Sequence, residues 1–190
     1  MINPSGINWT DQELVKRVLD GDKRAFGIIV QNTERLVAGI IHKMIDLSSE
    51  RKDLAQDIYL KVYQKLPTFR FQSRLSTWVA QIGYNTCLDY LRKKKLPVTG
   101  DIESIPDSTD VAINGEQVFS KERAQLLRAA IDKLPPISRT LIILYHTEDL
   151  SYEEIGQVVQ LPQGTVKSYL FRARKALKDQ LLLEYKEEEL

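Results

Sequence analysis

The sequence predicts an all-α fold in which a flexible acidic linker joins two small helical domains, the C-terminal one containing a helix-turn-helix. Three observations support this prediction. Apolar residues recur at helical spacing on both sides of residues 96–119, that stretch itself lacks such a period, and a tight turn joins two helical patterns near the C-terminus. The predicted boundaries are 1–95, 96–119 and 120–190, which a chain of 190 residues can accommodate.

Four helices are expected in the first domain. Residues 11–20 form a short helix closed by Gly21, and residues 23–45 form a long one that is apolar on all sides and is therefore central to a core. A third helix covers about residues 49–66 and ends at Pro67. A loop over residues 68–75 then leads to a fourth helix over about 76–94.

The linker contains two prolines, two glycines and scattered acids. Its 24 residues could span at most ~80 Å at about 3.3 Å per residue. In the second domain, helical patterns occupy 120–134, 135–150, 151–161 and 162–185. Ser151 and Glu154 form a capping box that marks a helix start, and Pro162 and Gly164 occupy the following turn. These two helices and their turn form the predicted helix-turn-helix.

Charge is distributed in blocks, although the net charge is only +1. Residues 161–178 contain five basic and no acidic side chains, and residues 69–95 contain six basic side chains and one acidic. By contrast, residues 96–120 contain five acidic and no basic side chains. Two basic surfaces separated by an acidic connector are typical of a chain that contacts nucleic acid at two places.

Several function classes are disfavoured. A single cysteine, Cys87, and two distant histidines, His42 and His146, predict neither a disulfide nor a metal site. The sequence has no Gly-rich phosphate loop and no Ser or Cys nucleophile near a histidine, so we expect no enzyme activity and no cofactor. With no apolar run of about 20 residues and no signal peptide pattern, we expect a cytoplasmic protein without membrane insertion.

The helix that begins near Thr165 has two distinct faces. Val166, Leu170, Ala173 and Leu177 recur at i, i+4, i+7 and i+11 and form a stripe for burial. The remaining surface is polar and basic, and its members are Thr165, Ser168, Tyr169 and Arg172, flanked by Lys167, Arg174 and Lys175. A solvated amphipathic helix is the simpler alternative, but the capped helix and tight turn before it favour insertion into a DNA major groove.

Residues 134–177 resemble the C-terminal promoter-reading domain of bacterial sigma factors. Three segments of the family pattern are present, namely L-P-x-x-x-R, L-S-Y-x-E-I-A and G-T-V-K-S-R-x-x-R-A-R-x-x-L. Gly156 replaces the usual Ala, and Tyr169 replaces a common Arg, which could contact guanine in a way that a phenol cannot. The resemblance implies minus-thirty-five DNA contacts at Arg139, Thr165, Lys167, Ser168, Tyr169, Arg172, Arg174 and Lys175.

Residues 53–69 resemble the sigma segment that docks on core RNA polymerase. Asp53, Gln56 and Asp57 keep the family spacing of i, i+3 and i+4 and so share one helical face. The opposite side is apolar and comprises Leu54, Ile58, Tyr59, Val62 and Leu66. The alternative is that the three polar residues only solvate the helix.

Residues 69–94 resemble the adjoining segment that opens the promoter at the minus-ten element, and Gly83 and Tyr84 depart from it. The implied DNA contacts are Arg70, Phe71, Gln72, Ser73, Arg74, Trp78, Asn85, Arg92 and Lys93. A flipped base needs a polar pocket with a stacking wall, and the backbone of a single strand needs cations. Trp78 either supplies that wall or belongs to the core.

These resemblances identify the chain as similar to the small extracytoplasmic-function (ECF) group of sigma factors. They imply a non-enzymatic specificity subunit of bacterial RNA polymerase that directs promoter-specific initiation. The implied partners are core polymerase, mainly the clamp of its largest subunit, promoter DNA and an anti-sigma factor. The linker would thread toward the polymerase active-site channel. The alternative function is a standalone DNA-binding regulator that keeps this architecture without serving polymerase.

Overall fold

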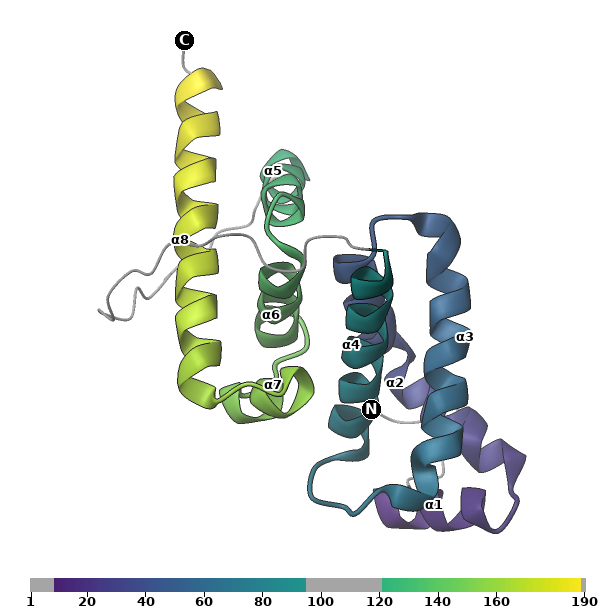
Figure 1. The fold of residues 1–190 in the computed structure, drawn as a ribbon. Coiled ribbons are helices and arrows are strands. Elements are labelled where there is room, and N and C mark those ends of the chain that lie inside the picture. The colour runs from purple at the N-terminus through teal and green to yellow at the C-terminus, as the bar shows by residue number, and fades with distance from the viewer. Residues whose placement is uncertain (1–8, 95–120, 189–190) are drawn as a thin grey trace.

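A computed structural model describes residues 9–94 and 121–188, and all regular elements in them are helical (Figure 1). The elements are α1 (Asp11–Leu19), α2 (Lys23–Met44), α3 (Ser48–Lys65), the 3₁₀ turn η1 (Leu66–Thr68), α4 (Leu75–Lys93), α5 (Lys121–Asp132), α6 (Pro136–His146), α7 (Tyr152–Val159) and α8 (Gln163–Glu188). The predicted all-α fold with two helical domains is confirmed. The predicted linker lies outside the described residues.

Helix starts follow local side-chain chemistry. Ser151 Oγ accepts from the backbone N–H of Glu154, and the Glu154 carboxylate accepts from the N–H of Ser151, so the predicted capping box at α7 is confirmed. Thr10 and Glu13 form a second capping box at α1. The third helix gives way to η1 after Lys65, so Pro67 lies in a 3₁₀ turn.

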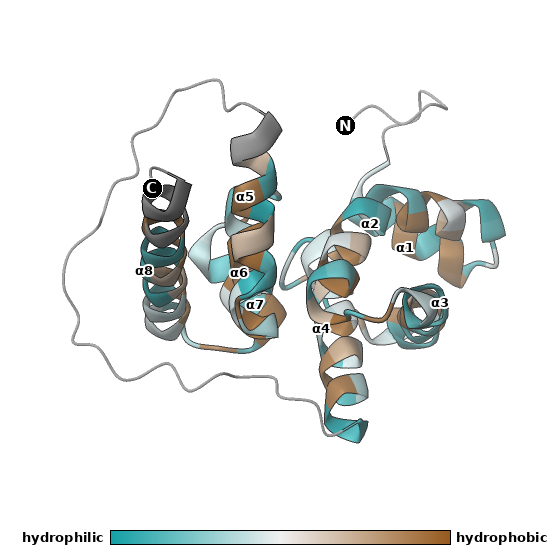
Figure 2. Ribbon diagram, turned by 90° about the horizontal axis from the view of Figure 1, so that it is seen from above, coloured by the Kyte–Doolittle hydropathy of each residue, from teal (hydrophilic) through white to brown (hydrophobic). Residues whose placement is uncertain are grey.

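The N-terminal domain packs α2, α3 and α4 around a core of branched aliphatic side chains. Ile29 and Ile40 of α2, together with Ile58 and Val62 of α3, are fully buried or nearly so. α4 lies between α3 on one side and α6 and α7 on the other (Figure 2). It therefore has neighbours in both domains.

The C-terminal domain is organised around α8. Val166, Leu170 and Ala173 are completely buried, and Leu177 is nearly so, which confirms the predicted stripe. This stripe packs against α5, α6 and α7. A fully buried Val or Leu contributes roughly 1.5–3 kcal/mol, so the stripe fixes which face of α8 remains available to a ligand.

The two domains also pack against each other, α2 on α6 and α4 on α7. At Gly39 of α2, an added Cβ would lie 3.7 Å from Cγ2 of Ile143 in α6. This short separation shows that α2 and α6 approach closely.

Among the described helices, none combines the length and apolar character that crossing a bilayer requires.

Candidate nucleic-acid and protein interfaces

One face of α3 is open to solvent along its polar residues. Asp53, Gln56 and Asp57 are all exposed, while Leu54 and Ile58 are buried on the opposite side. The 3.6-residue period of the helix thus separates the two sets as predicted. The polar face makes three side chains available to a partner at once, although its docking role remains a prediction.

An apolar groove of about 500 Å³ borders this polar face, between α2 and α3. The ring of Phe26 meets that of Tyr63 edge to face, with centroids 5.1 Å apart. Leu60 and Tyr63 are 55% and 50% exposed, unusually high for large apolar side chains, and Gln56 forms part of the groove wall. This groove was not predicted from the sequence, in which its local signal is Leu60 and Tyr63 on the polar side of α3.

The loop before α4 and the first turn of α4 together carry a row of three aromatic rings. Phe71, which is 44% exposed, has its ring centroid 4.7 Å from that of Phe69, and Phe69 lies 5.0 Å from Trp78. Phe71 has a φ of +56°, a left-handed conformation that is uncommon for a bulky residue. Trp78 is half-buried at the other end of the row and packs against the core, and its role as a stacking wall stays a prediction.

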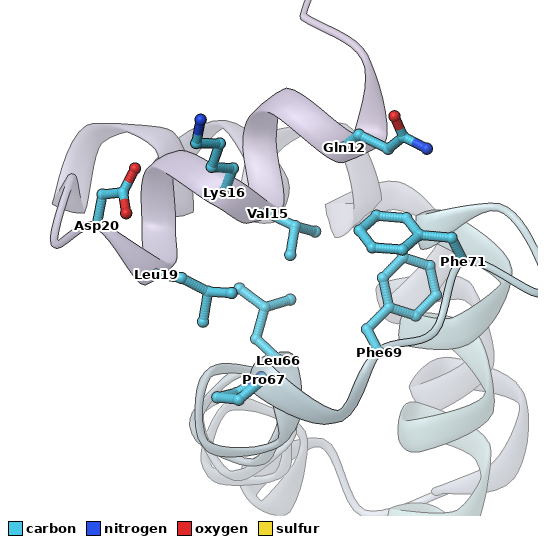
Figure 3. A pocket seen from close by; sticks show the side chains of 9 residues that line it. All are labelled: Gln12, Val15, Lys16, Leu19, Asp20, Leu66, Pro67, Phe69 and Phe71. Carbon is cyan, nitrogen blue, oxygen red and sulfur yellow. The ribbon is translucent and has the colours of Figure 1, made fainter.

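A pocket of about 480 Å³ opens beside this aromatic row. Figure 3 shows the Phe69 and Phe71 rings on one side and Leu66 with Val15 and Leu19 on the other. The remaining lining residues are Gln12, Lys16, Asp20 and Pro67. The pocket has an apolar wall and a polar rim, which suits a planar group with hydrogen-bonding edges.

α1 positions the loop that forms this pocket. The Asp11 carboxylate accepts a hydrogen bond from the backbone N–H of Leu75, at 2.7 Å, and so ties α1 to the start of α4. No sequence pattern had placed α1 in the site. Asp11 lies far from Leu75 along the chain, so no local spacing indicated the contact.

The cations predicted for minus-ten DNA differ in their surroundings. Arg70, Arg92 and Lys93 are exposed, as is Gln72, while Ser73 and Asn85 are half-buried. Arg92 lies 3.8 Å from the Asp89 carboxylate on the same helix. Arg74 instead reaches across to α7, where its Nη1 lies 3.5 Å from Oε1 of Glu154.

On α8, the residues predicted for minus-thirty-five DNA occupy the helix surface outside the buried stripe. Lys167 and Lys175 are exposed, and the half-buried members are Thr165, Ser168, Tyr169, Arg172 and Arg174. Three cations pack on aromatic rings, with Arg172 5.2 Å from the centroid of Tyr169, Arg174 4.9 Å from that of Tyr145 and Lys167 5.6 Å from that of Tyr152. Such contacts restrict long side chains before any ligand binds.

Arg139, also predicted to contact DNA, is buried at the domain boundary and only 6% exposed. Its Nη1 donates to Oδ1 of Asp46, at 2.9 Å. In this arrangement the guanidinium faces the N-terminal domain, so it could reach DNA only after the domains separate. The sequence could not indicate this because Asp46 and Arg139 belong to different domains.

Two residues that depart from the family pattern are neighbours across the same boundary. Tyr84 of α4 is 3% exposed, and burial together with the nearby Tyr169 phenol raises its pKa to about 12. Tyr169 belongs to α8 and is half-buried. Tyr169 is thus close enough to influence the charge state of Tyr84 across the domain boundary.

Comparisons with known proteins identify the family. The model of Sigma-70 region 2 matches residues 29–96, and that of Sigma-70, region 4 matches residues 124–177. The chain is 36% identical over 184 residues to the RNA polymerase sigma-H factor of Pseudomonas aeruginosa, which covers 88% of this chain and 91% of that protein. It is 33% identical over 177 residues to the ECF RNA polymerase sigma-E factor of Escherichia coli K12, covering 88% and 92%. The chain is an ECF-group RNA polymerase sigma factor.

Solved structures share the fold of this sigma factor. CnrH in complex with the cytosolic domain of CnrY matches with a TM-score of 0.64 and 22% identity, over 90% of this chain and 96% of that one. The sigma factor RpoE in complex with the anti-sigma factor NepR from Bartonella quintana matches with a TM-score of 0.62 and 23% identity, over 82% and 96%. The predicted role in promoter-directed transcription initiation is confirmed by family membership. Sigma factors are transcription regulators rather than enzymes.

Proposed function

We propose that this sigma factor docks on core RNA polymerase through α3 and reads promoter DNA with the loop before α4 and with α8. The observation that carries the proposal is the open polar face of α3 beside an exposed apolar groove. Hydrogen-bonding groups next to aromatic and aliphatic anchors are the usual composition of a protein interface. The partner is the clamp of the largest polymerase subunit, in the bacterial cytoplasm.

At the minus-ten element, the aromatic row supports capture of an unpaired base. Phe71 is exposed at the edge of a pocket large enough for a nucleobase, and the Phe69 ring packs behind it with its plane tilted by 55°. Base stacking on an aromatic ring contributes about 1–3 kcal/mol. Arg70, Arg92 and Lys93 supply the exposed cations that the backbone of a melted strand requires.

At the minus-thirty-five element, α8 enters the major groove with its N-terminal turns leading. Lys167 and Lys175 are exposed and placed for phosphates, while Arg172 offers a guanidinium for a base edge. Ser168 donates its hydroxyl to the Gly164 carbonyl, at 3.0 Å. Arg172 is likewise bonded within α8, since its Nε donates to the Ser168 carbonyl at 3.3 Å, and the base contact would fall to its other guanidinium N–H groups.

We assign an anti-sigma factor as a further partner. The similar structures CnrH and RpoE were solved with CnrY and NepR respectively, and NepR is described as an anti-sigma factor. An anti-sigma factor for this chain would cover the docking groove or the DNA surfaces.

Binding to purified core polymerase tests the proposal. Asp53→Ala combined with Gln56→Ala removes one carboxylate and one amide from the docking face, and we expect at least a tenfold loss of core affinity. Asp179→Ala combined with Gln31→Ala removes the same groups from other exposed positions and serves as the control. Equal core binding by both double variants would contradict the proposal. DNA binding without any core binding would instead support a standalone regulator.

A further inference from the structure

Five side chains from three helices form a continuous cluster on the C-terminal domain, the ring cluster. Tyr145 and His146 end α6, Tyr152 begins α7, and Lys167 and Arg174 belong to α8. The Tyr145 and Tyr152 rings stack with their centroids 4.9 Å apart and their planes 10° from parallel. Lys167 lies 5.6 Å from the centroid of Tyr152, and Arg174 lies 4.9 Å from that of Tyr145. Each ring of the stack therefore has a cation of α8 over it.

The turn between α6 and α7 fixes the two tyrosines relative to each other. The backbone N–H groups of Thr147 and Glu148 both donate to the Ile143 carbonyl, at 2.9 and 3.1 Å, and so close α6. The capping box of Ser151 then starts α7 directly before Tyr152. Both rings are thus carried by backbone that hydrogen bonds hold in place, and the stack forms without a ligand.

His146 completes the contacts of Arg174. The Nε of Arg174 donates to Nε2 of His146, at 3.3 Å, and the imidazole meets the Tyr145 ring edge to face with centroids 4.9 Å apart. Desolvation, and then the Arg174 charge, lower the pKa of His146 from its ordinary value of 6.5. The imidazole is therefore neutral at pH 7, with its proton on Nδ1 and a lone pair on Nε2 for the guanidinium.

The groups that hold the two cations carry no charge of their own. Lys167 and Arg174 are seven residues apart, so they project from the same side of α8, about 10.5 Å apart along its axis at roughly 1.5 Å per residue. Among the described residues, no carboxylate pairs with either cation. Arg74, by contrast, is held by the Glu154 carboxylate. The ring cluster restrains its cations and leaves their positive charge available to DNA phosphates.

We infer that the two tyrosines and His146 are positioning residues for α8, which keep the side chains of Lys167 and Arg174 in place before DNA binds. A long cationic side chain loses rotamer freedom when it binds a phosphate, and ordering it beforehand lowers that cost. The preformed cluster stands on the contacts within the chain, whereas its effect on DNA binding rests on the proposed function.

The side-chain N–H of Arg174 tests the ring cluster without DNA. In NMR spectra of the ¹⁵N-labelled full chain, its Nε–H signal is identified by its loss in Arg174→Ala. We expect this proton to exchange with water at least about tenfold more slowly than that of the exposed Arg70, because it is hydrogen-bonded. His146→Ala should remove the protection, and His146→Gln, which keeps an acceptor, should retain most of it. Exchange in the parent chain as fast as that of Arg70 would overturn the inference.

Binding of a short fluorescent duplex of mixed sequence tests the consequence for DNA. Tyr145→Leu removes the ring beneath Arg174 and half of the stack, and we expect the Kd to rise about three- to tenfold. Tyr145→Phe keeps the ring and should stay within about twofold of the parent chain. Trp9→Leu removes the ring 4.4 Å from Arg17, a cation without a predicted DNA contact, and is the matched control. Circular dichroism reports whether each variant keeps its helix content.

A double-variant cycle separates positioning from a structural or direct role of Tyr145. If the ring acts by holding Arg174, Tyr145→Leu should change duplex affinity by less than about twofold when Arg174→Ala is already present. An equal loss in both backgrounds would overturn the inference. A parent chain that does not bind the duplex would instead contradict the proposed function, and the Arg174 signal would still decide whether the ring cluster holds the guanidinium.

Discussion

The proposed docking face on α3 is exposed in this structure, whereas two arginines predicted to contact DNA are held in ion pairs. Asp53, Gln56 and Asp57 are exposed, and the groove beside them is open. By contrast, Arg74 and Arg139 are engaged by carboxylates of the other domain. A partner that binds the exposed face of α3 therefore meets no obstacle in this arrangement of the domains.

The two arginines differ from that face because each is already paired. If they contact DNA as predicted, the Arg74–Glu154 and Asp46–Arg139 pairs must first break. The exposed partners in both pairs make each interaction weak.

The largest effect is expected from the groove on the open side. Leu60→Ala combined with Tyr63→Ala removes two large exposed apolar side chains, and we expect core affinity to fall about thirtyfold because such anchors dominate interfaces. DNA binding by the free chain should not change. Isothermal titration with core polymerase measures the effect.

Leu47→Ala combined with Leu182→Ala is the matched control, since these residues are 53% and 50% exposed elsewhere on the molecule. A loss of core affinity in the control as large as that in the test pair would show that the groove has no special role.

A smaller effect is expected from a single cation on the DNA side. Lys167→Ala removes an exposed charge from α8, and we expect a several-fold loss of duplex affinity and a salt dependence reduced by roughly one unit of slope. Lys23→Ala, an exposed cation at the start of α2, is the control. Identical salt slopes for both variants and the parent chain would exclude Lys167 from the phosphate contacts.

Gly83 and Gly156 stand where the family usually has Ala, and we expect substitution by Ala to change the free energy of unfolding in opposite directions at the two positions. At Gly83 in α4 the added Cβ would lie 3.8 Å from Ile58, an ordinary contact, so we expect a gain in the free energy of unfolding of about 0.5–1 kcal/mol. At Gly156 in α7 it would lie 2.8 Å from the Leu161 carbonyl oxygen, a backbone atom.

We therefore expect Gly156→Ala to lower the free energy of unfolding by about 1 kcal/mol or more despite the higher helix propensity of Ala. Urea unfolding followed by circular dichroism measures both variants. Stabilisation by Ala at both positions would show that the turn after α7 relaxes freely.

The smallest expected effect is that of lowering the pH on the Glu154 carboxyl group. Hydrogen bonding to Ser151, first its backbone N–H and then its side chain, and the Arg74 charge hold the pKa of Glu154 below its usual value of 4.5. Because the folded pKa is lowered, this stabilisation is present above about pH 4.5 and is lost as the pH falls through the folded value. We expect the Arg74–Glu154 pair to weaken slightly over that range, which the distance between fluorophores placed on the two domains would report.

Glu154→Gln should remove part of this pH dependence. Glu13 forms the equivalent capping box at α1, and hydrogen bonding to Thr10 likewise lowers its pKa. Glu13→Gln is the control, because Glu13 belongs to a capping box within the N-terminal domain. A change in interdomain distance with Glu13→Gln as large as that with Glu154→Gln would contradict the role assigned to the Arg74–Glu154 pair.

Local periodicity was sufficient to predict the helices and their buried faces. The stripe from Val166 to Leu177, the capping box at Ser151 and the exposed face at Asp53 all depend on spacings of three or four residues. Helical geometry alone determines such relations, so they are visible before any tertiary contact is known.

The remaining features depend on contacts between residues far apart in the chain. The Asp11 bond to the N–H of Leu75, the Asp46 bond to Arg139 and the proximity of Tyr84 to Tyr169 leave no trace in local spacing. Charge blocks predicted two basic surfaces but not that Glu154 of the C-terminal domain pairs with Arg74 of the first one. The packing of α4 against α7 and of α2 against α6 brings the two domains together.

Promoter-specific transcription by the reconstituted holoenzyme tests the central claim most directly. Core polymerase, this sigma factor and a pool of genomic fragments are incubated with nucleotides, and the RNA start sites are sequenced. We predict discrete start sites that are absent with core alone and are lost with Asp53→Ala plus Gln56→Ala. Start sites indistinguishable from those of core alone, with a chain that is folded and binds core, would contradict the account.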